Sequence, residues 1–73
     1  MPNSLTFEVE GEVVENLPNT SFRVKLAASE KIVLCHLAGK MRIHWIRLLP
    51  GDKVRVAMAG PNETLGRIIY KLK

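Results

Sequence analysis

The chain has 73 residues, and its 11 Lys and Arg residues outnumber its 7 Asp and Glu residues to give a net charge of +4. With 47% hydrophobic and 25% charged residues, its composition is that of a globular protein. This length is typical of one small domain, which excludes most two-lobed enzymes and multi-domain regulators. The charge favours an anionic partner: nucleic acid, an acidic protein or an anionic membrane.

Alternation of apolar and polar residues predicts the first two strands. Residues 7–13 alternate with glutamates on the solvent-facing side, Gly11 marks a sharp bend, and the adjacent Val13 and Val14 indicate a bulge. Residues 17–20 form a turn, in which an Asn tolerates the left-handed conformation, and residues 21–26 form the second strand.

The third strand is predicted at residues 31–37. Val33 and Cys35 are assigned to the inward face, because the alternative places His36 in the core, where an unsatisfied imidazole is costly. The alternation then breaks, and residues 38–49 are predicted to form one or two helical turns and a loop.

Two more strands complete the predicted set, at residues 52–58 and 64–72. In the last of them Ile68 and Tyr70 are predicted to point inward. Five strands with a short helix or helical loop between the third and fourth are typical of an OB-fold barrel. An SH3-like barrel is the rival, but its helical turn usually precedes the last strand. We therefore predict an all-β OB-fold over residues 1–73, as one domain.

The charge is unevenly distributed along the chain. Residues 1–35 contain five acids and three bases, whereas residues 36–73 contain eight bases and two acids. The second half therefore has a net charge of +6 against −2 for the first, which favours an oriented basic docking surface.

No catalytic or metal-binding constellation is found. Cys35 and His36 are neighbours on a strand and point to opposite faces, so they do not form a thiolate–imidazole pair. The glutamates of the first strand fit a solvated face, and no metal-ligand spacing or phosphate loop is present. We expect no enzyme activity and no cofactor. A single cysteine, no signal peptide and no membrane-spanning run predict a cytoplasmic protein.

The most basic segment lies between the third and fourth predicted strands. Lys40, Arg42 and Arg47 provide charges for phosphates, while Met41 and Trp45 offer a wedge and a stacking ring for bases. The alternative is that Met41 and Trp45 cap the open end of the barrel and the bases form a solvated face. Further candidate RNA contacts lie on the strands and at the C-terminus: Arg23, His36, Arg67, Lys71 and Lys73.

At these residues the chain resembles bacterial-type translation initiation factor one. The motifs are Leu-Pro-Asn-Thr at 17–20 followed by Phe-Arg-Val at 22–24, His36 with Gly-Lys-Met-Arg at 39–42, Ile-Arg at 46–47, Leu-Pro-Gly-Asp-Lys-Val at 49–54, and Gly-Arg-Ile at 66–68 with Tyr70. They occur in order over almost the whole chain, with nearly constant spacing.

The resemblance implies an OB-fold that binds the small ribosomal subunit at the decoding (A) site. It further implies contacts with ribosomal RNA and an adjacent ribosomal protein, and joint action with initiation factors two and three in start-site selection and subunit joining. The family is not catalytic. By motif match, the implied RNA contacts fall on residues that the charge distribution also selects: Lys40, Met41, Arg42, Arg47 and Arg67.

The chain departs from the family pattern in its turns. Residues 27–30 lack the usual Asn-Gly, and residues 59–65 lack the usual Pro-Tyr-Asp. Leu65 stands where the family commonly has a base, and Trp45 replaces a usual tyrosine. The resemblance therefore does not extend to the RNA contacts that the tyrosine of Pro-Tyr-Asp and this base make in the family.

Two other classes of function remain open from the sequence. A general single-strand RNA binder of the cold-shock type needs surface aromatics on the second and third strands, where only Phe22 occurs, on the inward face. A protein-interaction module would dock an acidic partner on the basic face, or a basic one on Glu8, Glu10 and Glu12.

Overall fold

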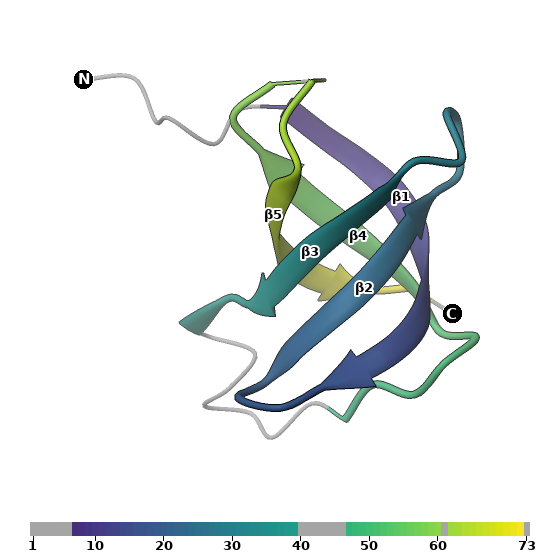
Figure 1. Cartoon of the computed structure of the whole chain (residues 1–73), viewed down its shortest axis with the longest axis vertical. Helices are drawn as coiled ribbons and strands as arrows, with labels where there is room; N and C mark the ends of the chain where they lie inside the picture. Colours follow the sequence, from purple (N-terminus) through teal and green to yellow (C-terminus); the bar gives the residue numbers. More distant parts are fainter. Residues whose placement is uncertain (1–6, 40–46, 61, 73) are drawn as a thin grey trace.

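The computed structural model describes residues 7–39, 47–60 and 62–72. In this part of the chain five strands close into a barrel in the order β1-β2-β3-β5-β4 (Figure 1). β3 and β5 run parallel, and the other neighbouring strands are antiparallel. The strands are β1 (Phe7–Leu17), β2 (Ser21–Leu26), β3 (Ile32–Leu37), β4 (Lys53–Met58) and β5 (Leu65–Lys71). The predicted all-β OB-fold is confirmed.

The long strand β1 belongs to both halves of the barrel. Its first part pairs with β4 and its second part with β2, and the register to β2 shifts between Val13 and Glu15, which leaves Val14 as an extra residue. At the bend, a Cβ on Gly11 would lie 2.6 Å from Val24 Cγ1 and 2.8 Å from the backbone oxygen of Lys25. The predicted bulge and the sharp bend at Gly11 are therefore both present, because only glycine allows β2 to approach so closely.

Two connections use left-handed backbone at residues other than glycine. The β1–β2 turn has Asn19 at φ 64° and Thr20 at φ 56°, as the Asn in this turn predicted. In the β2–β3 connection Glu30 has φ 60°, and its N–H donates to the oxygen of Leu26 over 2.9 Å. The predicted helical turns of the β3–β4 connection fall mainly on residues 40–46, which lie outside the described part.

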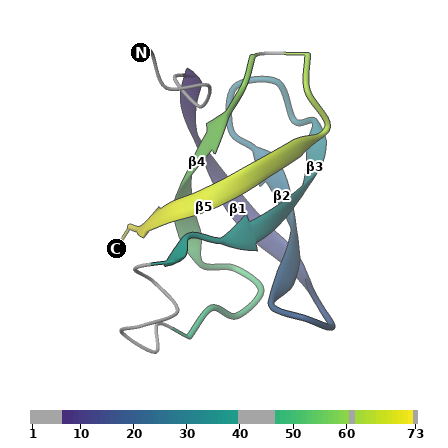
Figure 2. The ribbon, with the colours of Figure 1, turned by 90° about the vertical axis from the view of Figure 1, so that its left-hand side faces the viewer.

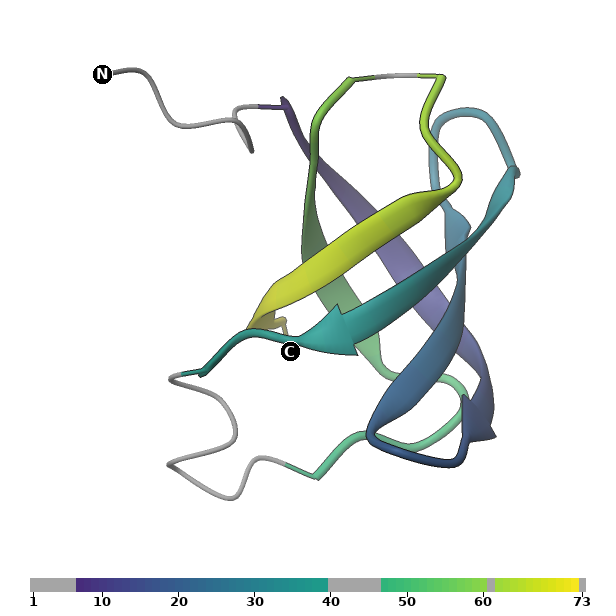
Figure 3. The ribbon, with the colours of Figure 1, turned by 60° about the vertical axis from the view of Figure 1, so that its left-hand side comes forward.

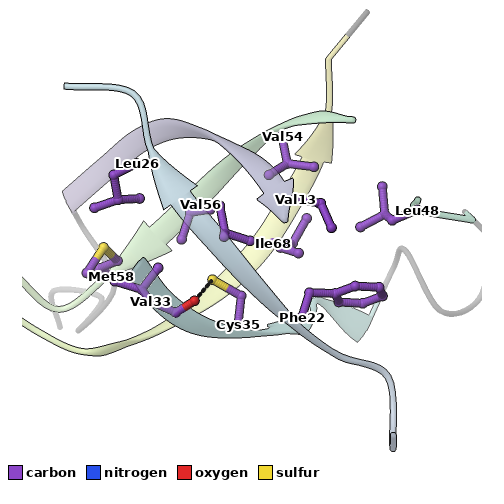
Figure 4. Close-up of a cluster of buried hydrophobic side chains, with 11 residues drawn as sticks. Val13, Phe22, Leu26, Val33, Cys35, Leu48, Val54, Val56, Met58 and Ile68 are labelled. Atoms are coloured by element: carbon purple, nitrogen blue, oxygen red, sulfur yellow. Dashed lines mark hydrogen bonds between the residues drawn. The ribbon is translucent and has the colours of Figure 1, made fainter. Parts of the chain in front are cut away.

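The core fills the inside of the barrel mainly with aliphatic side chains, together with the ring of Phe22 and the sulfur-containing Cys35 and Met58 (Figure 4). All five strands contribute, and Leu48 closes one end with 3% of its surface exposed. Val33 and Cys35 point inward and His36 outward, as predicted. The buried cluster consists of Val13, Phe22, Val24, Leu26, Val33, Cys35, Leu48, Val54, Val56, Met58 and Ile68.

One side chain of β5 does not follow the predicted alternation. Ile68 is fully buried as predicted, but Tyr70 is 60% exposed, so its inward assignment is wrong. The cause is a shift of register: Val56 pairs with Ile68, whereas the preceding Arg55 pairs with Tyr70, which leaves Ile69 as an extra residue. Beyond this bulge the faces exchange, and Tyr70 points outward beside Arg55.

The connections divide between the two ends of the barrel. The β1–β2 turn and residues 47–52 lie at one end, and the β2–β3 and β4–β5 connections lie at the other (Figure 2). Because β3 and β5 run parallel, both begin near the second end and finish near the first. Residues that follow β3 therefore emerge at the same end as residues 47–52.

Candidate nucleic-acid interface

The last part of the β3–β4 connection is tied to the end of the barrel. The backbone oxygen of the buried Leu48 accepts a hydrogen bond of 3.1 Å from Asn16 Nδ2. Gly51, at φ 99°, donates its N–H to the oxygen of Val13 over 2.7 Å, and Val13 donates to the oxygen of Asp52 over 2.9 Å. These bonds, together with the packing of Leu48, hold residues 47–52 in one arrangement against β1.

Asp52 and Lys71 add a charged anchor to the same segment. Asp52 Oδ2 accepts the N–H of Leu49 over 2.9 Å and lies 3.7 Å from Lys71 Nζ. Lys71 Nζ also donates to the backbone oxygen of Arg47 over 3.4 Å. Lys71, which the sequence predicted as an RNA contact, is therefore engaged with residues 47–52 and supports the backbone that presents the exposed Arg47.

The acids of β1 lie beside the bases of β4, because these two strands close the barrel. Lys53 Nζ is 2.9 Å from Glu12, and the Arg55 guanidinium is 3.4 Å from Glu10 and 3.8 Å from Glu8. Each such pair adds at most about 1 kcal/mol, since its side chains are substantially exposed. The consequence is electrostatic: these two bases of the second half are neutralised, and this face presents little net charge.

The outer faces of β2, β3 and β5 contain three predicted RNA contacts. Arg23 Nε lies 3.2 Å from Glu15 Oε1, with more than half of both side chains exposed. His36 is exposed, and its Nε2 is 3.4 Å from Ser21 Oγ. Arg67 is exposed on β5 directly beside His36 in the parallel pairing. The structure therefore places His36 and Arg67 together, whereas Arg23 is engaged with β1.

Four bases of the described residues make no ion pair with another described residue: Lys25, Lys31, Arg47 and Arg67. Arg67 lies where the β3–β4 connection begins, since the next residue of β5, Ile68, accepts a hydrogen bond of 2.9 Å from the N–H of Ala38. Arg47 lies near the end of the same connection. Available positive charge thus flanks this connection at both of its ends.

The other predicted contacts lie outside the described residues. They are Lys40, Met41, Arg42 and Trp45 in the connection itself, and Lys73 at the C-terminus. Their roles, and the choice between RNA contact and barrel cap for Met41 and Trp45, stay predictions.

Sequence reasoning did not identify the residues that anchor the connection. Asn16 and Asp52 do so through the hydrogen bonds given above. The Pro-Gly-Asp sequence at 50–52 is a turn signal that could have indicated Asp52. Nothing in the sequence points to Asn16, because its partner lies 32 residues away in the chain.

Metal-ligating side chains do not cluster in the described part of the chain. No group of three or more His, Cys, Asp or Glu side chains there is placed to hold a metal ion. Cys35 is fully buried, and burial raises the pKa of its thiol to about 12, so it is not a nucleophile at neutral pH. In the same part of the chain, no helix has the length and hydropathy to cross a membrane.

Comparison with known proteins finds one family model, described as translation initiation factor 1A / IF-1, that matches residues 1–73. Among solved structures, the translation initiation factor IF-1 from the Wolbachia endosymbiont of Brugia malayi is 48% identical, with a TM-score of 0.72 over 92% of this chain and 78% of that one. YjeQ from Thermotoga maritima is 28% identical with the same TM-score, over 92% of this chain and 23% of that one. YloQ, a circularly permuted GTPase, is 20% identical with a TM-score of 0.72 over 100% of this chain and 25% of that one, a likeness of fold alone.

Proposed function

Because the chain belongs to the translation initiation factor 1A / IF-1 family, we propose that it binds the small ribosomal subunit at the decoding (A) site through ribosomal RNA. In this proposal one domain, residues 1–73, acts as a cytoplasmic monomer without catalysis or cofactor. It contacts an adjacent ribosomal protein and works with initiation factors two and three in start-site selection and subunit joining. The carrying observation is the charge of Arg47 and Arg67, which make no ion pair with a described residue and lie on either side of the β3–β4 connection.

In the proposed binding, basic side chains and apolar side chains contact different parts of the RNA. Arg47 and Arg67, with Lys40 and Arg42, contact phosphates, where guanidinium groups form paired hydrogen bonds. Met41 and Trp45 contact bases. His36 and Lys73 extend the basic surface, while Arg23 and Lys71 contribute to it from within their ion pairs.

Chemical footprinting of small-subunit RNA tests this proposal. Protection confined to the decoding site is expected for the wild type, and a much weaker protection for the double variant Arg42→Ala with Arg47→Ala. The matched control is Arg55→Ala, which also removes an arginine charge but on the neutralised β1–β4 face. Full protection by the double variant at wild-type affinity would refute the site, and no decoding-site protection by the wild type would refute the function.

The cold-shock type of general RNA binding gains no support from the described strands. Phe22 is 7% exposed and belongs to the core, and no aromatic side chain of β2 or β3 faces outward. Affinity should therefore be much higher for the small subunit than for a random oligonucleotide. Equal affinities would favour the general binder.

A further inference from the structure

The outer face of the sheet carries three aliphatic side chains that form a continuous surface away from the β3–β4 connection. Leu34 of β3 pairs directly with Leu65 of β5, and Ile32 lies two residues before Leu34 on the same face. Ile32 is 47% exposed, Leu65 59%, and Leu34 is half-buried. We call these three residues the aliphatic platform.

The platform lies in a shallow surface hollow of about 320 Å³. Its floor includes the backbone of β3, and Arg23, which pairs with Leu34 across β2 and β3, forms one wall. The hollow is large enough for one aliphatic side chain of a partner. Exposed apolar surface of this kind, bordered by polar groups, marks interaction sites on small proteins.

Two bases flank the platform along the strands. Lys25 lies directly across from Ile32, and Arg67 follows Leu65 by two residues on the same face of β5. Neither base makes an ion pair with a described residue. The outward positions of β2, β3 and β5 contain no acidic side chain, and the acids Glu30 and Glu63 lie in the connections just before β3 and β5.

We propose that the aliphatic platform docks a protein segment in which an aliphatic side chain is flanked by Asp or Glu residues. An apolar centre inside a charged border is the anatomy of a protein interface, and the border charge here selects an acidic partner. Nucleic acid is less well matched, because base-stacking surfaces are built from aromatic rings. A second copy of this chain fits poorly, since the glutamates of its β1 already pair with Lys53 and Arg55.

The platform shares Arg23 and Arg67 at its border with the proposed RNA interface, but its three aliphatic side chains lie away from Arg47. β3 and β5 begin near the end of the barrel opposite to residues 47–52 (Figure 3), and the platform lies on these first residues. A protein segment bound there does not need the space beside Arg47. The inference therefore goes beyond the proposed function and does not depend on it.

Methyl NMR of the full chain tests this inference with a short synthetic peptide as the probe. The peptide contains one Leu flanked by Glu residues, and two matched peptides replace either the Leu by Ser or the Glu residues by Gln. We expect the Leu–Glu peptide to shift the methyl signals of Ile32, Leu34 and Leu65, and each matched peptide to bind at least about tenfold more weakly.

Two variants connect the binding to the platform. Leu65→Ser removes an exposed side chain and should weaken the Leu–Glu peptide about tenfold. Val14→Ser is the matched control, since it removes a 41% exposed apolar side chain from β1, and should leave the affinity unchanged. Both signal dispersion and thermal unfolding report that the variants are folded.

Several results would overturn the inference. Absence of platform shifts at millimolar peptide would exclude the docking site. Equal binding of the peptide without Leu would show attraction by charge alone. Shifts of the same methyl groups by a short single-stranded RNA, but not by the peptide, would assign the platform to nucleic acid. Decoding-site footprinting is independent of all of these results.

Discussion

Gly66 lies where β5 crosses the core, and the substitution Gly66→Ala tests how closely the barrel is packed. A Cβ at this position would be 2.6 Å from Val56 Cγ1 and 3.3 Å from both Cys35 Sγ and Met58 Cγ. All three neighbours are completely buried, so none can move into solvent. Overpacking of this kind costs about 1–3 kcal/mol, and contacts on two sides favour the upper part of that range.

For a domain of this size, 1 kcal/mol changes the melting temperature by about 4–8 °C. Gly66→Ala should therefore lower the melting temperature by roughly 10–20 °C in thermal unfolding followed by circular dichroism, with urea unfolding giving the free energy. Gly60→Ala is the control, because a Cβ there would lie within 4 Å of no described atom outside its chain neighbours. Its free energy of unfolding should change by no more than about 0.5 kcal/mol.

A double-mutant cycle identifies the cause of the loss. Val56→Ala removes the methyl group that the new Cβ would meet, so the double variant should be at least about 1 kcal/mol more stable than the sum of the single effects predicts. Simple additivity of Gly66→Ala and Val56→Ala would refute the close approach. A loss for Gly66→Ala no larger than that for Gly60→Ala would refute it as well.

Three further predictions concern a buried thiol, the anchor and the salt dependence. Burial raises the pKa of the Cys35 thiol to about 12. Above the unfolded-state pKa of about 8.5 only the folded state keeps the thiol proton, so the free energy of unfolding should fall with pH by up to about 1.4 kcal/mol per unit. Urea unfolding of the wild type and of Cys35→Ala at pH 8 to 10 should show this slope in the wild type alone. Asp52→Ala should lower the free energy of unfolding by about 1–2 kcal/mol, because the N–H of Leu49 loses a charged acceptor, and Asp52→Asn should recover part of it; equal losses would contradict this reason. Arg67→Gln should reduce the slope of log affinity for small-subunit RNA against log salt by about 0.7–1, whereas Arg55→Gln, on the neutralised face, should leave the slope unchanged.

Local pattern was sufficient to predict the strands. Period-two alternation places inward and outward side chains wherever a strand is regular, and it assigned Val33, Cys35 and His36 correctly. The bulge of β1 was also predictable, because two adjacent valines break the alternation beside Gly11. These features depend on residues close in the chain, which one sequence contains in full.

What the sequence did not predict depends on strands that are distant in the chain. The bulge at Ile69 is the exception: the adjacent Ile68 and Ile69 break the alternation close to Gly66, as the two valines do in β1, but simple alternation was followed there and assigned Tyr70 to the wrong face. The ion pairs between β1 and β4 join residues more than 40 positions apart, such as Glu12 and Lys53. Only closure of the barrel brings these strands together, and alternation carries no information on which strands become neighbours.

Closure of the barrel also changes where the net charge acts. The sequence distributes eight bases over residues 36–73, but pairing with β1 neutralises Lys53 and Arg55, and Asp52 holds Lys71. Of the described bases in that half, Arg47 and Arg67 remain without an ion pair to a described residue, and they flank the β3–β4 connection. A uniformly basic domain would bind RNA in many orientations, whereas a domain with one neutral face favours a single orientation. Reversal of Glu10 and Glu12 to lysine should therefore increase affinity for random RNA more than affinity for the small subunit, and competition binding with both RNAs measures this loss of specificity.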